Sequence, residues 1–322
     1  MGRRRLAGRL PHHHRPDRQR PRNAPVITLR HHVLTIVAVF LALAAGIVLG
    51  GGPLSDVGPA VTASSNDRAA TPADGSAGAD YTEAFVSALG PPILSTRLAE
   101  RSVAIVTVPG ADEQVVTALA GQVEAAGGTV TARYDLGADL VDPAQKSLVD
   151  TLGSQLLTQQ AADAVTADAS TYDRIGQLIG LAVASKVAEG EDRTRKARAI
   201  ADAVSGAGLM TQPDDVSRRA PLVLLVLGDD AGDEGSDAIL AGLAEGLAAQ
   251  ATGVVVAGTL ADGGSGQLGR LRADPAAASV ASVDGVDTVA GQVAAIMVLQ
   301  RSLTTPGGSF GASGADGAVP LG

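Results

Sequence analysis

A run of 17 uncharged, mostly apolar residues near the N-terminus constrains this 322-residue chain more than any other feature. The run extends from Val33 to Leu49, and the GGGPL sequence at 50–54 lengthens the uncharged span to 22 residues. A transmembrane helix needs about 17–25 apolar residues, so the run is long enough to cross a bilayer core. Residues 1–32 carry nine arginines and one acidic residue. This positive flank predicts a cytoplasmic N-terminus, with the chain outside the cytoplasm from about residue 51 onward.

Two interpretations of this segment remain open. Ala42-Leu43-Ala44 fits the small-x-small pattern of a signal-peptide cleavage site. The apolar run continues beyond that site to Leu49, which favours an uncleaved anchor. Both interpretations place the body of the protein outside the cytoplasm. We expect residues 1–25 to form a basic disordered arm, unless translation starts at Val26, and residues 26–52 to form the anchor or signal segment.

Small residues recur every four positions along the apolar run. They are Ala38, Ala42, Gly46 and Gly50. Such spacing places them on one face of a helix, where two membrane helices can approach closely. The alternative is a general bias toward small residues, since the chain contains 40 glycines. From this face we expect a homo-oligomer formed through the membrane helix, with the lipid bilayer as a further partner.

The charge and composition of the remaining chain exclude several classes of function. The whole chain has a net charge of −9, so the residues after 32 carry −17 once the +8 of the N-terminal arm is removed. Such an acidic body argues against nucleic-acid binding, which requires basic surface. The chain has no cysteine, and all five histidines lie within the first 32 residues. This excludes disulfides, zinc–thiolate sites, cysteine nucleophiles and Ser-His triads from residues 33–322, and no other spacing recommends an enzyme or a bound cofactor.

Hydrophobic patterning predicts two βαβ units, and their continuous apolar strands indicate a parallel sheet that is covered on both faces. The first unit comprises a strand over 103–108, a helix over 113–126 after the N-cap Asp112, and a strand over 129–134; the second comprises 222–227, 237–250 and 253–257. A strand at 279–283 and a helix at 286–303 follow, and helical patterns at 143–163, 171–188 and 192–207 lie between the units. We predict an α/β fold: a single transmembrane helix followed by a soluble, mostly parallel-sheet α/β domain with a helical insertion.

Segments rich in Gly, Pro, Ser, Ala and Asp bound this domain. Residues 53–92 have no sustained apolar period and predict a flexible linker, apart from a short helical pattern at 81–89 that Gly90-Pro91-Pro92 ends. The α/β domain is expected over 93–303. The Gly-rich tail 304–322 is expected to be disordered.

One glycine-rich segment resembles a nucleotide-binding pattern. Gly264-Ser265-Gly266-Gln267-Leu268-Gly269 matches G-x-G-x-x-G, and Asp284 lies 20 residues after Gly264. A functional pattern needs a crossover helix whose N-terminus holds the pyrophosphate. Only five residues separate Gly269 from Pro275, which is too short for that helix. We therefore expect a flexible surface loop here.

Five acidic residues lie in the loop 229–237, directly after an apolar strand. Ligands of α/β folds bind at that edge of the sheet. The carboxylates of Asp229, Asp230 and Asp233 form a weak candidate site for a hard cation such as calcium, although their spacing is not that of an EF-hand. The alternative is a solvated turn in which Asp233, Ser236 or Asp237 caps the next helix, and we favour it.

Three stretches of the sequence resemble one known family. They are Val26–Gly52, Arg101–Asp112 with Leu140–Pro143 downstream, and Ser282–Leu299 with Phe310–Gly311 and Ala315–Leu321. Together they are similar to the actinobacterial copper transporter family typified by mycobacterial copper transport protein B. The resemblance extends over most of residues 26–321 and favours Val26 as the natural start. It implies a copper-efflux and copper-tolerance component of the cell envelope, in the outer membrane of mycobacteria-like cells, with copper ion as the transported species.

The residues themselves add two constraints to that function. Beyond the anchor, Met210 and Met297 are the soft ligands of the kind that Cu(I) prefers, so we expect weak copper affinity in the isolated domain 91–304. One apolar helix cannot line a pore alone, so any pore must be formed by oligomers or with a partner. The alternative function is a membrane-anchored extracytoplasmic interaction or scaffold domain that recruits other envelope proteins and binds no metal.

Overall fold

The structure is a computed structural model, and it describes residues 73–166 and 168–321. The chain divides into two compact units, 1–71 and 72–322, and the first lies outside the described residues. The basic arm and the apolar run with its small-residue face over 38–50 therefore fall outside them too. In the part that the structure describes, no helix combines the length and the hydropathy that a membrane span requires.

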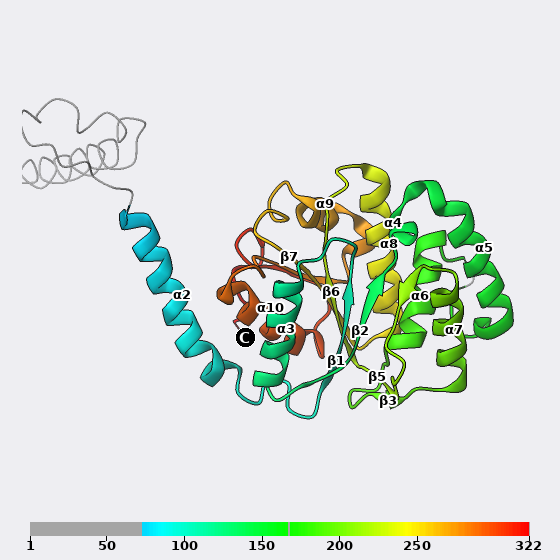
Figure 1. The fold of residues 1–322 in the computed structure, drawn as a ribbon, viewed down its shortest axis with the longest axis horizontal. Coiled ribbons are helices and arrows are strands. Elements are labelled where there is room, and N and C mark those ends of the chain that lie inside the picture. Colours follow the sequence, from blue (N-terminus) through cyan, green and yellow to red (C-terminus); the bar gives the residue numbers. More distant parts are fainter. Residues whose placement is uncertain (1–72, 167, 322) are drawn as a thin grey trace, which may run out of the picture. The chain divides into compact units, whose positions relative to one another are not determined.

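A seven-stranded sheet forms the centre of the second unit, in the order β4-β2-β1-β6-β7-β8-β9 (Figure 1). Neighbouring strands pair in parallel, except that β2 and β4 are antiparallel. The strands are β1 (Ser102–Thr107), β2 (Thr129–Leu136), β4 (Met210–Thr211), β6 (Leu222–Val226), β7 (Gly253–Gly258), β8 (Ala281–Asp284) and β9 (Ser309–Phe310). A separate antiparallel pair consists of β3 (Glu191–Asp192) and β5 (Arg218–Arg219). The predicted mostly parallel α/β sheet is confirmed.

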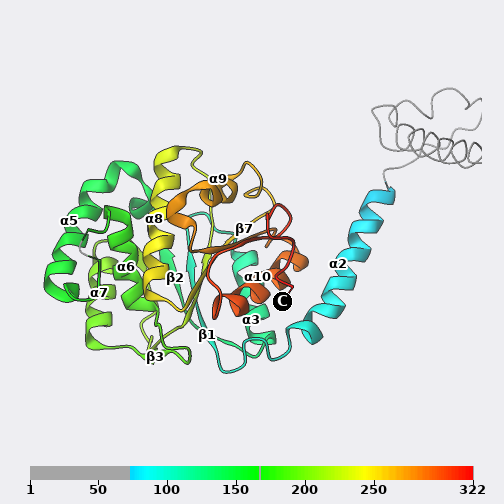
Figure 2. The ribbon, with the colours of Figure 1, turned by 180° about the vertical axis from the view of Figure 1, so that it is seen from behind.

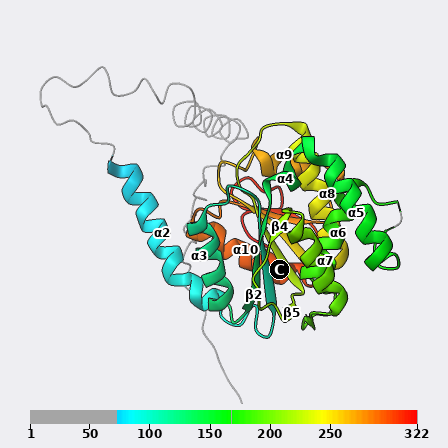
Figure 3. The same ribbon diagram turned by 45° about the vertical axis from the view of Figure 1, so that its right-hand side comes forward.

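Helices cover both faces of the sheet (Figure 3), as its continuous apolar strands require. In β1, Ala104 and Val106 belong to one core cluster and Val103 and Ile105 to the other, because successive side chains of a strand point to opposite faces. One face carries α2 (Ala73–Leu94), α3 (Glu113–Ala125) and α10 (Val289–Ser302). The other carries α4 (Ala138–Val141), α5 (Lys146–Leu156), α6 (Thr171–Val183), α7 (Arg195–Gly206), α8 (Glu234–Gln250) and α9 (Gln267–Ala273). Three short helical segments adjoin this second layer: η1 (Pro143–Gln145), η2 (Leu157–Ala161) and η3 (Pro275–Ala277).

The helical patterns predicted between the two βαβ units are present as α5 with η2, α6 and α7. They do not form an insertion apart from the sheet. Instead α6 packs along α8, and their apolar side chains share one core cluster with the strands. The predicted cap of α3 is also present, since the Asp112 carboxylate accepts a hydrogen bond from the Gln114 N–H at 2.7 Å.

Glycines bring the backbones of α6 and α8 into contact. A Cβ on Gly176 would lie 2.7 Å from the carbonyl oxygen of Leu243, and a Cβ on Gly246 would overlap the carbonyl oxygen of Asp173. Protein interiors have almost no free volume to absorb an added methyl group. The spacing of these two helices therefore depends on the absence of side chains at both positions.

The structure corrects the second half of the predicted linker. Residues 73–92 belong to α2, which continues through two prolines to Leu94. Gly90 of this helix is buried, and a Cβ there would lie 3.1 Å from the Val293 side chain of α10. Contact with α10, about 200 residues away in the sequence, stabilises a helix that local composition did not predict beyond 81–89.

The predicted disordered tail is likewise wrong. β9 pairs in parallel with β8, and the Phe310 side chain is buried. The Asp316 carboxylate accepts a hydrogen bond from the Ser309 N–H at 2.7 Å and so closes the tail into a loop. Gly311 and Gly317 have φ of +103° and +101°, which glycine adopts without strain. The glycines that predicted disorder thus serve the turns of an ordered segment, and the domain extends beyond residue 303.

We expect Gly246→Ala to destabilise the domain by about 1–3 kcal/mol, because the added methyl forces α6 and α8 apart. The matched control is Gly121→Ala in α3, where a Cβ meets nothing within 4 Å. It should raise stability by about 0.5–1 kcal/mol, since alanine has the higher helix propensity. Urea unfolding followed by circular dichroism measures both. Equal midpoints for the two variants would contradict the proposed role of the α6–α8 contact.

Candidate functional site

Doubly wound folds bind ligands at the carboxyl edge of the sheet, where the strand order reverses. Here the reversal lies between β1 and β6. The Asp229 N–H donates a hydrogen bond to the Pro109 carbonyl at 2.9 Å, and a Cβ on Gly228 would overlap that same carbonyl. Gly110 has a φ of +85°, and its missing side chain leaves room for the Asp229 carboxylate. Backbone atoms therefore occupy the crevice in which such folds hold a ligand.

Hydrogen bonds within the protein fix the acidic loop after β6. Of the three residues expected as a cap, Asp233 is the N-cap of α8, and its carboxylate accepts from the N–H and the hydroxyl of Ser236, both at 2.9 Å. Arg270 of α9 donates to Asp230 at 2.7 Å and to Asp237 at 2.6 Å. Across the described residues, no three His, Cys, Asp or Glu side chains gather as a metal site requires. The loop carboxylates hold the β6–α8 turn against α9.

The charges of this loop stabilise one another. The side-chain hydrogen bond from Arg270 lowers the pKa of Asp230, and the backbone N–H of Ser236 lowers the pKa of Asp233. Hydrogen bonds to Asp237 and Asp230 in turn raise the pKa of the Arg270 guanidinium. All three shifts favour the charged form. These residues therefore form an ion-paired and capped β6–α8 turn that is held against α9.

The structure corrects the interpretation of the G-x-G-x-x-G segment as a flexible loop. The crossover from β7 to β8 does contain a helix, α9, which begins at Gln267 inside the motif with Gly266 as its N-cap. A Cβ on Gly269 would overlap the carbonyl of Gly264, so the third glycine packs the helix onto the preceding turn. Five residues separate the motif from Pro275, but the helix begins within the motif and so gains length from it. Asp284, the residue placed to hold a ribose, is 1% exposed and bonded within the protein.

Arg272 forms a clamp at this end of the sheet that sequence patterning did not identify. Its Nε donates to the Ser282 hydroxyl at 2.9 Å, and its Nη2 donates to Asp284 at 2.8 Å and to the Phe310 carbonyl at 2.7 Å. Its Nη1 donates to the Ser313 hydroxyl at 2.9 Å. The second oxygen of Asp284 accepts from the Ser313 N–H at 2.9 Å. The Arg272 clamp thus joins α9, β8 and the C-terminal segment. Its side-chain partners lie 10 to 41 residues away in the sequence, so local sequence patterns do not reveal it.

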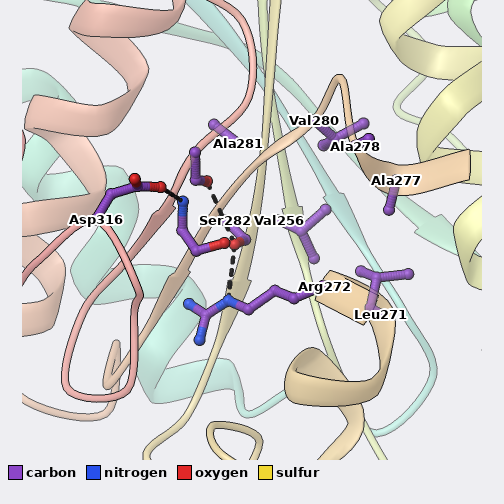
Figure 4. A pocket seen from close by; sticks show the side chains of 11 residues that line it. Val256, Leu271, Arg272, Ala277, Ala278, Val280, Ala281, Ser282 and Asp316 are labelled. Carbon is purple, nitrogen blue, oxygen red and sulfur yellow. Dashed lines mark hydrogen bonds between the residues drawn. The ribbon is translucent and has the colours of Figure 1, made fainter. Parts of the chain in front are cut away.

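A cavity of about 190 Å³ adjoins the Arg272 clamp (Figure 4). Its apolar lining comprises Val256, Leu271, Ala277, Ala278, Val280 and Ala281. Figure 4 shows Arg272 and Ser282 bonded to each other, and Asp316 bonded to the backbone of the tail. Because these polar groups are already engaged, they hold the tail in place, and their arrangement does not pair a nucleophile with a base.

Met210 and Met297 lie in separate cores. Met210, in β4, belongs to the cluster on the α6–α8 face, and Met297, in α10, belongs to the cluster on the opposite face. The sheet separates the two sulfur atoms, so they cannot bind one copper ion together. Sequence reasoning identified both residues but could not place them relative to each other.

We expect Arg272→Met to destabilise the domain by about 3–5 kcal/mol, because it leaves the buried Asp284 carboxylate without its partner. Arg218→Met is the matched control, since Arg218 and Asp192 are 49% and 92% exposed; it should cost less than about 1 kcal/mol. Unfolding midpoints and proteolysis of the tail after residue 303 measure the effect. If Arg272→Met does not fold, Arg272→Met with Asp284→Asn should recover folding. A tail that stays protected in Arg272→Met would contradict the clamp.

The Asp230–Arg270 pair predicts a pH dependence. The pKa of Asp230 is lower in the folded protein than its unfolded value of about 3.9. The ionised carboxylate therefore contributes fully to the free energy of unfolding above that pH, and this contribution is lost as the pH falls through the folded pKa. Asp230→Asn should lower stability at pH 7 by less than about 1 kcal/mol, because the pair is partly exposed and screened. The difference from the unmodified protein should shrink below about pH 4. Stability profiles that remain parallel as the pH is lowered would show that the pair contributes nothing.

The sequence matches known proteins along most of its length. The profile of the family described as copper transport outer membrane protein, MctB, matches residues 26–320. The copper transporter MctB of Mycobacterium tuberculosis is 28% identical over 295 residues, covering 85% of this chain and 92% of the relative, and that of Mycobacterium bovis shows the same values. The copper transporter MctB of Mycobacterium leprae is 27% identical over 322 residues, covering 90% of this chain and 96% of the relative. The chain therefore belongs to the MctB family of copper transport outer membrane proteins.

Proposed function

We propose that this protein acts in copper transport at the cell envelope, as a single-pass anchored component of copper efflux and copper tolerance. The observation that carries the proposal is the family match over residues 26–320, because the match includes both the apolar run and the α/β domain. The mycobacterial relatives that match most of the chain are named copper transporters. The family description also supports an envelope location.

Charge and hydropathy support the topology within this proposal. The apolar run 33–49 follows an arm of net charge +8, and such a flank stays on the cytoplasmic side. The α/β domain then lies outside the cytoplasm. Its lack of cysteine is compatible with an oxidising compartment, because no thiol is present to be oxidised.

Copper transfer in this proposal takes place at the membrane segment of an assembled oligomer. The described part of the domain offers no pair of soft ligands, since Met210 and Met297 lie on opposite faces of the sheet. A single helix does not enclose a pore. The small-residue face of Ala38, Ala42, Gly46 and Gly50 would pair the membrane helices of several copies. The α/β domain would then position the copies and contact other envelope proteins.

A second candidate function is a membrane-anchored interaction domain that recruits other envelope proteins and binds no metal. The observation that favours it is the chemistry of the carboxyl edge of the sheet. There Arg270 and Arg272 bind carboxylates, hydroxyls and carbonyls of the protein itself. Within the described residues, this edge is built to hold the fold together.

Cellular copper content and growth in added copper distinguish the two functions. We would compare a strain that lacks the protein, the same strain restored with the chain from Val26, and one restored with residues 51–322 behind a cleavable signal. If the protein exports copper through an anchored assembly, its loss raises cellular copper and lowers tolerance, and only the anchored form restores both. Unchanged copper content and tolerance in the strain without the protein would favour the interaction domain.

A matched pair of anchor variants tests the oligomer within the same strains. Gly46→Ile places a branched side chain on the small-residue face, whereas Leu43→Ile, three positions earlier, leaves the side-chain volume unchanged. Both variants should reach the membrane fraction. We expect Gly46→Ile to lose copper tolerance and Leu43→Ile to keep it; equal tolerance in both would contradict assembly through this face.

A further inference from the structure

Helix α2 carries a row of large apolar side chains on its surface. Tyr81, Phe85, Leu89 and Ile93 recur every four residues and are 70%, 52%, 39% and 43% exposed. The Tyr81 and Phe85 rings stack with their centroids 6.2 Å apart. Isolated exposed apolar residues need no explanation, but an aligned row of them marks an interaction site. We call this row the α2 stripe.

A different face of α2 packs against the domain. Val86, Gly90 and Leu94 lie on that face: Leu94 is fully buried, Val86 packs against the same core cluster, and Gly90 adjoins α10. At about 100° per residue, the centres of the two faces are ~120° apart around the helix. Figure 2 shows α2 on the same side of the sheet as α3 and α10. Packing on α10 therefore leaves the α2 stripe accessible to another molecule.

We infer that the α2 stripe pairs with the α2 stripe of a second copy of this chain, in a parallel contact between two helices. A lipid surface is a poor alternative, because interfacial helices carry basic residues on their polar face. The α2 sequence contains Asp74, Asp80 and Glu83 and no lysine or arginine. Asp74 lies seven residues before Tyr81, and on helical geometry Asp80 and Glu83 lie about 140–160° from the centre of the α2 stripe. Glu83 accepts a hydrogen bond from the Val289 N–H of α10 at 3.2 Å, so two stripes can meet without bringing Asp80 or Glu83 into the contact.

The size of the α2 stripe fits copies that are already held close together. Its four side chains offer on the order of 400 Å² per chain, about half of the ~800 Å² per partner that a standard interface buries. Such a contact is weak between free molecules but sufficient between tethered ones, because tethering raises the effective concentration. In the sequence, residues 50–72 separate the apolar run from α2, so anchoring in one membrane would keep the α2 helices of neighbouring copies within reach of each other. The strength of the pairing, though not its geometry, rests on the proposed anchoring.

Cysteine cross-linking tests the contact in the full chain. The protein contains no cysteine, so each introduced thiol is unique. Phe85→Cys and Leu89→Cys lie near the centre of the α2 stripe. Ser87→Cys is the matched control, because Ser87 is exposed and lies about 180° from that centre. Cells that express each variant are fractionated into membrane and soluble parts, treated with diamide, and analysed on non-reducing gels for a product of twice the chain mass.

We expect the two α2-stripe cysteines to form that dimer about tenfold more than Ser87→Cys, because a disulfide requires Cβ atoms about 4 Å apart. Adding Phe85→Glu to Leu89→Cys should abolish the product by placing a charge in the contact. Equal cross-linking at all three positions, no dimer from either stripe position, or a product with the mass of a different partner would overturn the inference. Protein recovered in the soluble fraction would show that the proposed membrane anchoring is wrong, and this outcome is distinguishable from failure of the α2 contact.

Discussion

Burial of both faces of a parallel sheet is the constraint on which the rest of this structure depends. All five residues of β6 are buried, so neither face can be left to solvent. The chain has only three Phe, three Tyr and no Trp, and it fills both cores mainly with Val, Leu, Ile and Ala. Small side chains leave no gap only if the layers lie close together. The glycine contacts between α6 and α8, at Gly176 and Gly246, are the consequence on one face.

The carboxyl ends of the strands are also covered, here by loops and by the C-terminal tail. Many α/β folds keep this edge open for a ligand, whereas here Gly228 and Asp229 close onto Pro109 and the Arg272 clamp fastens the tail over β8. Among the described residues, the α2 stripe is an aligned row of exposed apolar side chains. The architecture therefore favours a rigid domain that contributes to assembly over one that binds a small molecule at the strand ends.

How much could be predicted from the sequence depended on the distance between interacting residues. β1 and β6 were predicted because each is a continuous apolar run. The cap Asp112 was identified, and Asp233 was among three candidate caps, because each binds a residue two or three positions away. The tail β9 was missed because it is stabilised by Arg272, 38 residues from the Phe310 carbonyl. Helix α2 was only partly predicted for the same reason. The acidic loop shows both cases: its cap is local, but its pairing with Arg270 becomes visible only in three dimensions.

The glycine-rich segment shows how a correct local rule can give a wrong structure. Its spacing to Pro275 is short for a complete crossover helix, and α9 is indeed short, with seven residues. The helix nevertheless forms, because Gly269 lets it pack on the turn that precedes it. Asp284 occupies the position expected for a ribose ligand and binds Arg272 instead. A G-x-G-x-x-G motif therefore indicates a nucleotide site only if its downstream acidic residue, here Asp284, is free to bind a ligand.

The central claim is that this member of the MctB family moves copper out of the cell through an anchored assembly. The most direct measurement is the rate at which cells preloaded with isotopic copper release it, compared between a strain with the protein and one without it. Copper transport predicts a slower release when the protein is absent, with the rate restored by the anchored chain. An unchanged release rate would contradict the claim, even if growth in copper differed between the strains.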